Sequence, residues 1–533
     1  NHLKTIIGVI ATQWLFDELF TNNAVTINDF NQSGTFIKLV DGTYNPPPAF
    51  AQTLIDNGTT FTLRSPQQIE WNFNVLGQIE TYVEPAGMTV TYTYDDDVLS
   101  TVSNGLERTL TFTYDDGRLT TVSDGNERDV HFVVDENSNL TEFIDAESKS
   151  ITYEYDSPGR LSKIFLPANP LVPIVTNVYD SLNRVMTQEA AGAGAWNFYL
   201  AGSRAEEVDA LGNRHVLYFN SLGSIYRDIN ALGQETTFER DPLNRLVRKI
   251  YPELNAVEWE YSPFDAGNPS GYNNIAKKTW KPKPGSGLSD VEHEFTYDPL
   301  WNKVATSTDG EDNTTTYTYD ATQGTLLTIE RPVIDAQTPT VTFTWNDFGQ
   351  MLTRIDETDI ESKFVYDSLT DTETLVEVIR DFGGLNLTTV YAYDAVGNVA
   401  GITDPRGNTT TFLYDDERRV IQQTDCTPWN YVTLVNYDDN GWHTSTQRET
   451  GDVVTPYQTW EISYNPNGTK SGITDPAGNE TTYEYDTLRR LQSQTDAENR
   501  TWQFSYDEVS RVVTVTDPSG VIAETKTYSD NGL

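Results

Sequence analysis

Apolar and polar positions alternate along most of this chain, in short runs separated by turn residues. In Tyr483-Glu484-Tyr485 two rings lie two positions apart with a polar side chain between them. A period of two places both rings on one face of an extended strand. Segments such as 394–398, which read Asp-x-x-Gly-Asn, follow these runs, and Asp, Asn and Gly suit tight turns. The pattern therefore predicts β-hairpins.

The hairpin signal recurs with a nearly fixed period, and Tyr393 to Tyr414 and Tyr485 to Tyr506 are both steps of 21 residues. A tyrosine is followed directly by aspartate at positions 94, 114, 155, 179, 297, 319, 366, 393, 414, 437, 485 and 506. Random order would give about four such pairs, so the chain is built from internal repeats. We take as structural anchors of the repeat Tyr94-Asp95, Tyr114-Asp115, Tyr155-Asp156, Tyr319-Asp320, Tyr393-Asp394, Tyr414-Asp415, Tyr485-Asp486 and Tyr506-Asp507.

Two strands and two turns fill about 21 residues, and stacked hairpins would form a spiralling antiparallel sheet with rings stacked along one face. We therefore predict an all-β array of Tyr-Asp hairpins over residues 84–533, after a lead-in β segment over 36–83. Residues 3–20 have apolar positions at helical spacing, which predicts a short N-terminal helix. We assign residues 1–35 to a helical cap or plug for the open end of the sheet.

The composition narrows the range of partners. The formal net charge is −43 and the sequence pI is about 4.3. Phosphate contacts need clusters of Lys and Arg, so this charge argues against nucleic acid as a partner, and it disfavours an anionic membrane surface. No apolar stretch has the length of a transmembrane helix. The acidic side chains are best interpreted as solvating a large β surface and protecting its edges.

The sequence offers little for catalysis or metal binding. Cys426 is the single cysteine and excludes an internal disulfide, and a buried thiol beside His443 is favoured over a reactive pair. Asp95 to Asp97 and residues 309–313 carry oxygen ligands suited to Ca²⁺, but neither follows the EF-hand order. We therefore predict no catalytic residue, no metal site and no cofactor. The histidines, which lack zinc-ligand spacing, are His2, His131, His215, His293 and His443.

Three motifs of this chain resemble the Rhs/YD-repeat family: Tyr114-Asp115-Asp116-Gly117-Arg118-Leu119, the turn 404–408 and Tyr483 to Asp486. The resemblance covers roughly residues 36–533, and its lead-in 41–48 is similar to the segment before the repeats of bacterial members. Members include bacterial polymorphic toxins, insecticidal toxin complexes and animal teneurins. The resemblance implies a β-shell that encloses a C-terminal effector in the toxins and forms part of an adhesive ectodomain in teneurins.

The chain departs from the toxin pattern at its end. Toxin members close the shell with a segment rich in Arg-Tyr-Tyr-Asp-Pro and Gly-Arg-Phe, where aspartates cut off the effector, and nothing here matches it before the chain stops at Leu533. Neither self-cleavage nor a toxin is therefore assigned to these residues.

Two functions of different kinds follow from the repeats and the resemblance. The first is a non-catalytic scaffold: a β-shell section of a large secreted or cell-surface protein that would encapsulate or display a C-terminal effector, with that effector or other protein subunits as partners. The alternative is an extracellular structural or adhesive repeat protein that contacts other cells or glycans. An enzyme is a distant third, because the aspartates have the spacing of turns rather than of an acid–base pair.

Overall fold

The computed structural model describes residues 23–29, 32–47, 50–106, 108–126, 128–263, 269–367, 374–507 and 512–527. Over these ranges the chain forms strands β1 to β46 and one short 3-10 helix, η2 (Pro269–Asn273), so the prediction of an all-β protein is confirmed. The helix expected over residues 3–20 lies outside the described residues. β1 (Ala24–Asp29) and β2 (Gln32–Lys38) are strands, so helical structure does not fill the segment 1–35.

The lead-in segment contains a small hydrophobic core. β1, β2 and β3 (Tyr44–Asn45) form a separate three-stranded antiparallel sheet. Phe36 and Tyr44 of this sheet pack with Leu54 and Leu63 of the first two strands of the main sheet, and Phe36 is fully buried. Burial of large apolar side chains is worth roughly 1.5–3 kcal/mol for each, so this contact fixes the small sheet against the first strands of the repeat array.

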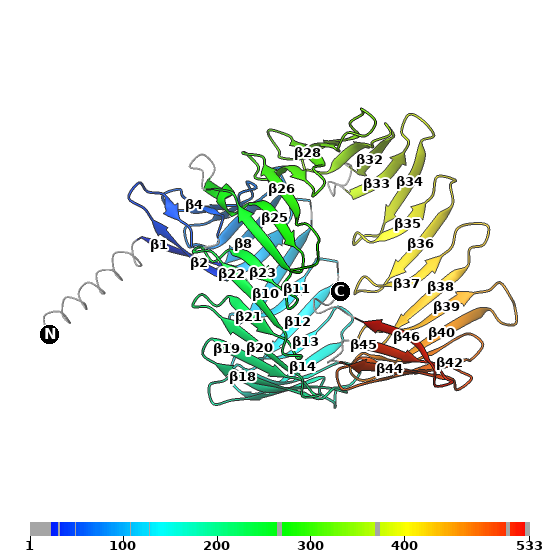
Figure 1. The fold of residues 1–533 in the computed structure, drawn as a ribbon. Coiled ribbons are helices and arrows are strands. Elements are labelled where there is room, and N and C mark those ends of the chain that lie inside the picture. Colours follow the sequence, from blue (N-terminus) through cyan, green and yellow to red (C-terminus); the bar gives the residue numbers. More distant parts are fainter. Residues whose placement is uncertain are drawn as a thin grey trace, which may run out of the picture.

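The main sheet is a single continuous ribbon in which each strand from β4 to β46 pairs antiparallel with its neighbours in the chain (Figure 1). We call β4 to β25 the first coil and β26 to β46 the second coil. The strands of the first coil are β4 (Thr53–Asp56), β5 (Phe61–Arg64), β6 (Glu70–Phe73), β7 (Ile79–Val83), β8 (Thr89–Asp95), β9 (Val98–Ser103), β10 (Thr109–Asp115), β11 (Arg118–Ser123), β12 (Asp129–Val134), β13 (Leu140–Ile144), β14 (Ser150–Ser157), β15 (Arg160–Phe165), β16 (Val175–Tyr179), β17 (Val185–Ala190), β18 (Ala195–Ala201), β19 (Arg204–Val208), β20 (Arg214–Phe219), β21 (Ile225–Ile229), β22 (Glu235–Arg240), β23 (Leu246–Ile250), β24 (Ala256–Tyr261) and β25 (Ile275–Lys281).

The second coil continues the same ribbon, and its consecutive strands pair antiparallel as in the first coil. Its strands are β26 (Val291–Tyr297), β27 (Val304–Thr308), β28 (Thr314–Tyr319), β29 (Leu326–Glu330), β30 (Thr340–Trp345), β31 (Met351–Ile355), β32 (Glu361–Asp367), β33 (Thr374–Arg380), β34 (Leu387–Tyr393), β35 (Val399–Thr403), β36 (Thr409–Tyr414), β37 (Val420–Thr424), β38 (Val432–Tyr437), β39 (His443–Glu449), β40 (Tyr457–Tyr464), β41 (Lys470–Thr474), β42 (Glu480–Tyr485), β43 (Leu491–Thr495), β44 (Thr501–Asp507), β45 (Val512–Thr516) and β46 (Ile522–Thr527).

Most side chains of the main sheet are only half-buried, because the ribbon is one layer thick. Residues as deeply buried as Val216 and Val341 are few among those described. Cross-strand neighbours must therefore supply much of the side-chain stabilisation. On the threonine-rich face, hydroxyl pairs such as Thr318–Thr328 at 2.6 Å and Thr403–Thr409 at 2.8 Å lie on adjacent strands.

Consecutive turns of an antiparallel ribbon lie alternately on its two edges. We call the turns inside each hairpin, which follow the Tyr-Asp anchors, the anchor turns, and those between hairpins the return turns. Figure 1 shows the ribbon descending through β10 to β14, rising through β19 to β23, and passing by β28 into the second coil. Most contacts between the two coils join residues that are 269 to 294 positions apart, which is the length of one turn of the spiral.

Candidate functional site: the repeat anchors and the seam between coils

The anchor tyrosines link successive hairpins through their hydroxyl groups. The Tyr414 hydroxyl donates a hydrogen bond of 2.8 Å to the carbonyl oxygen of Val399. Val399 is itself the cross-strand partner of the preceding anchor, Tyr393, at an irregularity in the register. Each such bond therefore ties one anchor to the strand paired with the anchor before it. The same bond is made by Tyr94 to Ile79, Tyr155 to Leu140, Tyr319 to Val304, Tyr393 to Leu375 and Tyr506 to Leu491.

Burial of the phenol groups suits this role. Burial raises the pKa of the anchor tyrosines above the usual value, so they stay neutral and keep the proton that they donate. Among the predicted anchors this holds for Tyr94, Tyr155, Tyr319, Tyr393, Tyr414 and Tyr485. We expected the rings to stack on one another; the linkage that the structure shows between successive anchors is instead hydroxyl to carbonyl.

The aspartate of the anchor organises a five-residue turn. In Asp394 to Asn398, carboxylate Oδ1 accepts the backbone N–H groups of Val396 and Asn398 at 3.0 and 2.8 Å, and Oδ2 accepts the Asn398 side-chain amide at 2.9 Å. Gly397 has a φ of 87°, a conformation in which glycine is unstrained. The return turn at Asp404 has the same geometry, so one turn chemistry serves both edges.

The fifth residue of the turn is chemically matched to the first, a relation that the sequence reasoning missed. Aspartate is followed four residues later by a donor, as in Asp415 with Arg419 at 2.6 Å and Asp404 with the Asn408 amide. Where asparagine replaces aspartate, its amide donates to an acceptor, as in Asn74 to Gln78 at 2.9 Å. The pairs Asn230–Gln234 and Asn346–Gln350 repeat this rule, and they are visible in the sequence.

Arginine at the fifth position also contacts the next hairpin. The Arg490 guanidinium forms an ion pair of 2.7 Å with Asp486 and lies 4.2 Å from the centre of the Tyr506 ring. Arg419 is placed in the same way between Asp415 and Tyr437, at 4.7 Å from that ring. Cation–π contacts of this kind add roughly 0.5–2 kcal/mol. The anchor turn thus stabilises its own hairpin and orients the following one.

Four predicted anchor aspartates depart from this turn. Asp95 pairs with Val98 and Asp115 pairs with Arg118, so only two residues connect these strands. The connecting residues, such as Asp96 and Asp97 with φ of 46° and 67°, are typical of the tightest hairpin turns. Asp156 instead forms a two-pronged ion pair with Arg160, and Asp507 lies within β44 opposite Val512. A two-residue turn therefore replaces the five-residue turn at Asp95 and Asp115.

The remaining anchors lie next to register irregularities or cap their own turns. Tyr114 pairs with Leu119 and Tyr485 pairs with Leu491, both next to an irregularity in the strand register. The carboxylate Oδ1 of Asp320 accepts the backbone N–H groups of Thr322 and Gln323, each at 2.8 Å. Asp320 therefore caps its turn through its side chain, as Asp394 does.

The two coils meet along a seam, which we define as the contacts between return turns of the first coil and anchor turns of the second. The Arg128 side chain donates to the Asp416 carbonyl at 2.6 Å, and Lys149 forms an ion pair of 2.6 Å with Asp439. Further along, the Ala168 N–H donates to the Asn440 side chain at 2.9 Å, and the Gly194 N–H donates to the Thr487 carbonyl at 3.2 Å. These polar contacts set neighbouring coils edge to edge.

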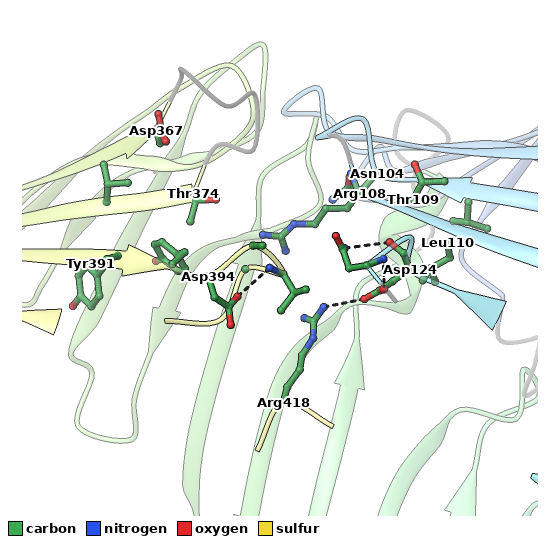
Figure 2. Close-up of a pocket in the computed structure, with 18 of the residues that line it drawn as sticks. Asn104, Arg108, Thr109, Leu110, Asp124, Asp367, Thr374, Tyr391, Asp394 and Arg418 are labelled. Atoms are coloured by element: carbon green, nitrogen blue, oxygen red, sulfur yellow. Dashed lines mark hydrogen bonds and ion pairs between the residues drawn. The ribbon is translucent and has the colours of Figure 1, made fainter. Parts of the chain in front are cut away.

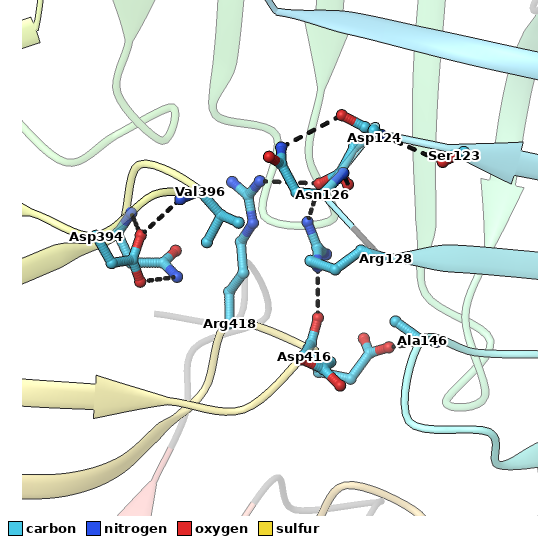
Figure 3. A network of polar contacts seen from close by, with 12 residues as sticks. Ser123, Asp124, Asn126, Arg128, Ala146, Asp394, Val396, Asp416 and Arg418 are labelled. Atoms are coloured by element: carbon cyan, nitrogen blue, oxygen red, sulfur yellow. Dashed lines mark hydrogen bonds and ion pairs between the residues drawn. The ribbon is translucent and has the colours of Figure 1, made fainter.

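Two glutamates at the centre of the seam make reciprocal contacts. The Asp416 N–H of the second coil donates to Glu147 of the first at 3.0 Å, and the Ala146 N–H of the first donates to Glu417 of the second at 3.1 Å. Figure 3 shows Arg418 and Arg128 reaching Asp124 from opposite coils, at 3.6 and 2.8 Å. Charge-assisted contacts of this kind are stronger than neutral ones but are screened by salt when exposed.

A cavity of about 880 Å³ lies in the seam where the turns separate. Its first-coil wall includes Arg108 and Leu110, and its second-coil wall includes Tyr391 and Asp394 (Figure 2). Arg418 and Arg108 extend toward this space from the two coils.

The other residues considered for chemistry lie in structural surroundings. Cys426 is half-buried in a return turn, and the His443 side chain contacts the Thr446 hydroxyl at 2.8 Å. The oxygens of Asp309 accept N–H groups of its own turn, from Glu311 and Asn313. Within the described ranges, no three His, Cys, Asp or Glu side chains are grouped as metal ligands would be. In the same part of the chain no helix has the length and apolar character needed to span a membrane.

Comparison with known sequences identifies the repeat. The family model described as RHS Repeat matches residues 393–425, 464–501 and 490–522. A protein of Dickeya dadantii named probable deoxyribonuclease RhsB is 23% identical over 383 residues, which are 72% of this chain and 21% of that protein. The chain therefore spans about a fifth of the length of this relative.

Comparison with solved structures supports the fold. A Photorhabdus luminescens Tc holotoxin pore matches over 95% of this chain and 31% of that chain, with a TM-score of 0.58 and 14% identity. TcdB2–TccC3 without its hypervariable C-terminal region matches over 94% of this chain and 32% of that chain, with a TM-score of 0.56 and 14% identity. At this identity the likeness shows a shared β-shell fold, and the chain corresponds to about a third of these toxin-complex chains.

Proposed function

Because the chain belongs to the Rhs/YD-repeat family, we propose that it is a non-catalytic wall: a β-shell section of a large secreted or cell-surface protein that encloses a C-terminal effector. In this proposal residues 36–83 start the wall and the hairpins from residue 84 onward build it. The Tyr-Asp anchors serve as structural joints, and the partners are the effector and other protein subunits.

The observation that carries the proposal is the seam. A ribbon that only extended from a surface would not need its edges to meet, yet here return turns of one coil contact anchor turns of the next at Arg128, Lys149 and Ala168. Edge-to-edge contact between successive coils converts a ribbon into a wall.

The turns support a structural rather than catalytic role for the aspartates. In the turns at Asp394 and Asp404 both carboxylate oxygens accept hydrogen bonds within their own turn. A general acid or base needs an oxygen directed at a reacting group, and these oxygens are directed at backbone and amide N–H groups.

Protease protection of the full-length gene product tests the enclosure. We expect segments C-terminal to the wall to resist a broad-specificity protease in the native protein and to be cut rapidly after the wall is unfolded by denaturant. The separately expressed C-terminal segment is the control for intrinsic resistance. Equal cleavage of the free and the wall-linked segment, with the wall intact on a gel, would contradict enclosure.

A second candidate, adhesive contact with a surface or a protein, is favoured by one observation. Trp429, Val453 and Val454 on neighbouring return turns of the second coil are 65%, 96% and 87% exposed. Apolar tips that project together commonly mark interaction sites. Cell or glycan binding that is lost in a Trp429→Ser, Val453→Ser, Val454→Ser variant would support this candidate, and unchanged binding would remove it.

A further inference from the structure

The hydrogen bonds that join strands along the ribbon differ from the contacts that join the two coils across the seam. Along the ribbon, adjacent strands such as β34 and β35 share a ladder of paired residues, from Val390–Thr403 to Tyr393–Val399. Anchor hydroxyls add a further link from hairpin to hairpin. Across the seam, no strand pairing joins the coils in the part of the chain that the structure describes, and the contacts are made by single groups at turn tips.

The seam contacts are also accessible to water and ions. The side chains of Lys149 and Asp439, which form one of the ion pairs across the seam, are 37% and 56% exposed. Arg418 reaches Asp124 only at 3.6 Å. Exposed pairs contribute little and are weakened further by salt, because ions screen charges over about 10 Å at 0.1 M. The bonds within strands lack this sensitivity.

A cavity interrupts one part of the seam. The cavity of about 880 Å³ lies between Arg108 on the first coil and Asp394 on the second, next to the Arg418–Asp124 contact (Figure 2). Elsewhere the turns are in direct contact, as where the Gly194 N–H meets the Thr487 carbonyl. The seam is therefore a row of separate contacts and not a fused joint.

We propose that the seam is a reversible closure along which the two coils part when the charged turn contacts are weakened, while each coil keeps its hairpin ladder. This inference rests on the proposed function as a wall, and it adds the line along which the wall opens. Opening there breaks turn-to-turn contacts centred on Glu147, Glu417, Arg128 and Lys149, and it leaves the strand pairing unchanged. The controlling variable is ionic strength at the turns.

Hydrogen exchange with mass spectrometry tests the closure on the full-length protein in sodium chloride from about 0.05 to 1 M. We expect peptides that carry the seam amides of Ala146, Ala168 and Asp416 to exchange about twofold to fivefold faster at high salt. Peptides of β34 to β36 should keep their rates. Seam amides that ignore salt, or strand amides that accelerate in parallel, would overturn the proposal.

A matched pair of substitutions separates the seam from the general effect of charge. Lys149→Glu places like charges opposite Asp439 across the seam, and we expect faster exchange at Ala146 and Ala168 already at low salt. Lys163→Glu is the control, because Lys163 and Glu154 form a similarly exposed pair within one hairpin of the first coil, at 2.7 Å. Adding Asp439→Lys to Lys149→Glu should restore slow exchange. Equal responses to both single substitutions would contradict the seam.

A disulfide across the seam provides the second test. A Cβ atom built on Gly194 lies 3.8 Å from the Thr487 Cβ, which is the usual separation in disulfides, and Ala210 would have to be reduced to glycine to make room for it. In Gly194→Cys, Thr487→Cys, Ala210→Gly, Cys426→Ser, the oxidised protein should lose the salt response and the reduced protein should keep it. A salt response that persists after oxidation would refute opening at the seam. Protease protection of the effector is measured separately, so the enclosure and the closure can fail independently.

Discussion

The hydroxyl group of an anchor tyrosine can be removed without changing the shape of the ring. In Tyr319→Phe the hydrogen bond of 2.8 Å to the Val304 carbonyl is lost, while the contact of Lys303 with the ring, at 5.6 Å, is kept. Tyr317 is a matched control, because it lies two residues earlier on the same strand and face. The structure gives the Tyr317 hydroxyl no hydrogen-bond partner among the described residues.

The expected loss follows from the geometry. A hydrogen bond between neutral groups contributes about 0.5–1.5 kcal/mol net to stability, and the substitution removes the donor and leaves a carbonyl acceptor. We therefore expect Tyr319→Phe to lower the free energy of local opening by about 1 kcal/mol, which is roughly a fivefold change in the opening equilibrium. Tyr317→Phe should change it by less than about 0.3 kcal/mol, as is usual for a half-exposed position.

Hydrogen exchange measured peptide by peptide distinguishes the alternatives. Faster exchange should be confined to β27 to β29, because in repeat proteins each unit contacts chiefly its neighbours. If Tyr317→Phe and Tyr319→Phe have the same effect, the hydroxyl-to-carbonyl link does not stabilise the ribbon. If exchange accelerates across the whole chain, the array unfolds as one cooperative unit and the reasoning from single hairpins is wrong.

Three further outcomes are expected. Tyr393→Ala should cost about 2–4 kcal/mol, measured by chemical denaturation, and should loosen the flanking hairpins first. In a double-mutant cycle, Asp486→Asn and Arg490→Gln should each lower the free energy of unfolding. The double variant should recover about 1 kcal/mol of it, because an amide then donates to an amide oxygen as in the asparagine turns. Additive losses would contradict the match between the first and fifth residues of the turn. The Asn479 amide and backbone N–H groups hold the pKa of Asp475 below its usual value, so its contribution is present above about pH 4 and is lost as the pH falls through the folded pKa. The exchange difference between wild type and Asp475→Ala should therefore shrink on acidification, and a difference that grew below pH 4 would refute this assignment.

The hairpins and their order were predictable because they depend on neighbouring residues. Alternation around Tyr483 and Tyr485 determines strand and face, and the segment 394–398 determines its own turn. The hydroxyl link was within reach as well, since the acceptor of Tyr414, Val399, is 15 residues earlier in the chain, the same distance as for Tyr155 and Leu140. The signal is an apolar residue 15 positions before the anchor, which holds for Tyr94, Tyr155, Tyr319, Tyr414 and Tyr506. For Tyr393 the acceptor, Leu375, is 18 positions earlier.

The seam was not predictable from the sequence. Its partners, such as Arg128 and Asp416, are 288 residues apart. Which turns meet at that distance depends on the sum of small twists over many strands, each of which varies by several degrees. Long return turns, such as the one over 282–290, also change the number of residues in one turn of the spiral. The tight turns at Asp95 and Asp115 were missed for a simpler reason: the sequence analysis considered only turns like that of segment 394–398.

The opposite placement of anchor turns and return turns restricts how such a chain can change its length during evolution. Inserting one strand would move the anchor turns of all later hairpins to the opposite edge of the ribbon. Inserting a whole hairpin would leave them on the same edge. An inserted hairpin still shifts one coil along the other by the width of one hairpin, so Arg128 would face a different anchor turn. Several seam contacts use backbone groups, namely the Asp416 carbonyl and the N–H groups of Ala168 and Gly194. Backbone groups are present at every turn, so genes of this kind can gain or lose hairpins by unequal recombination and still encode coils that fit together.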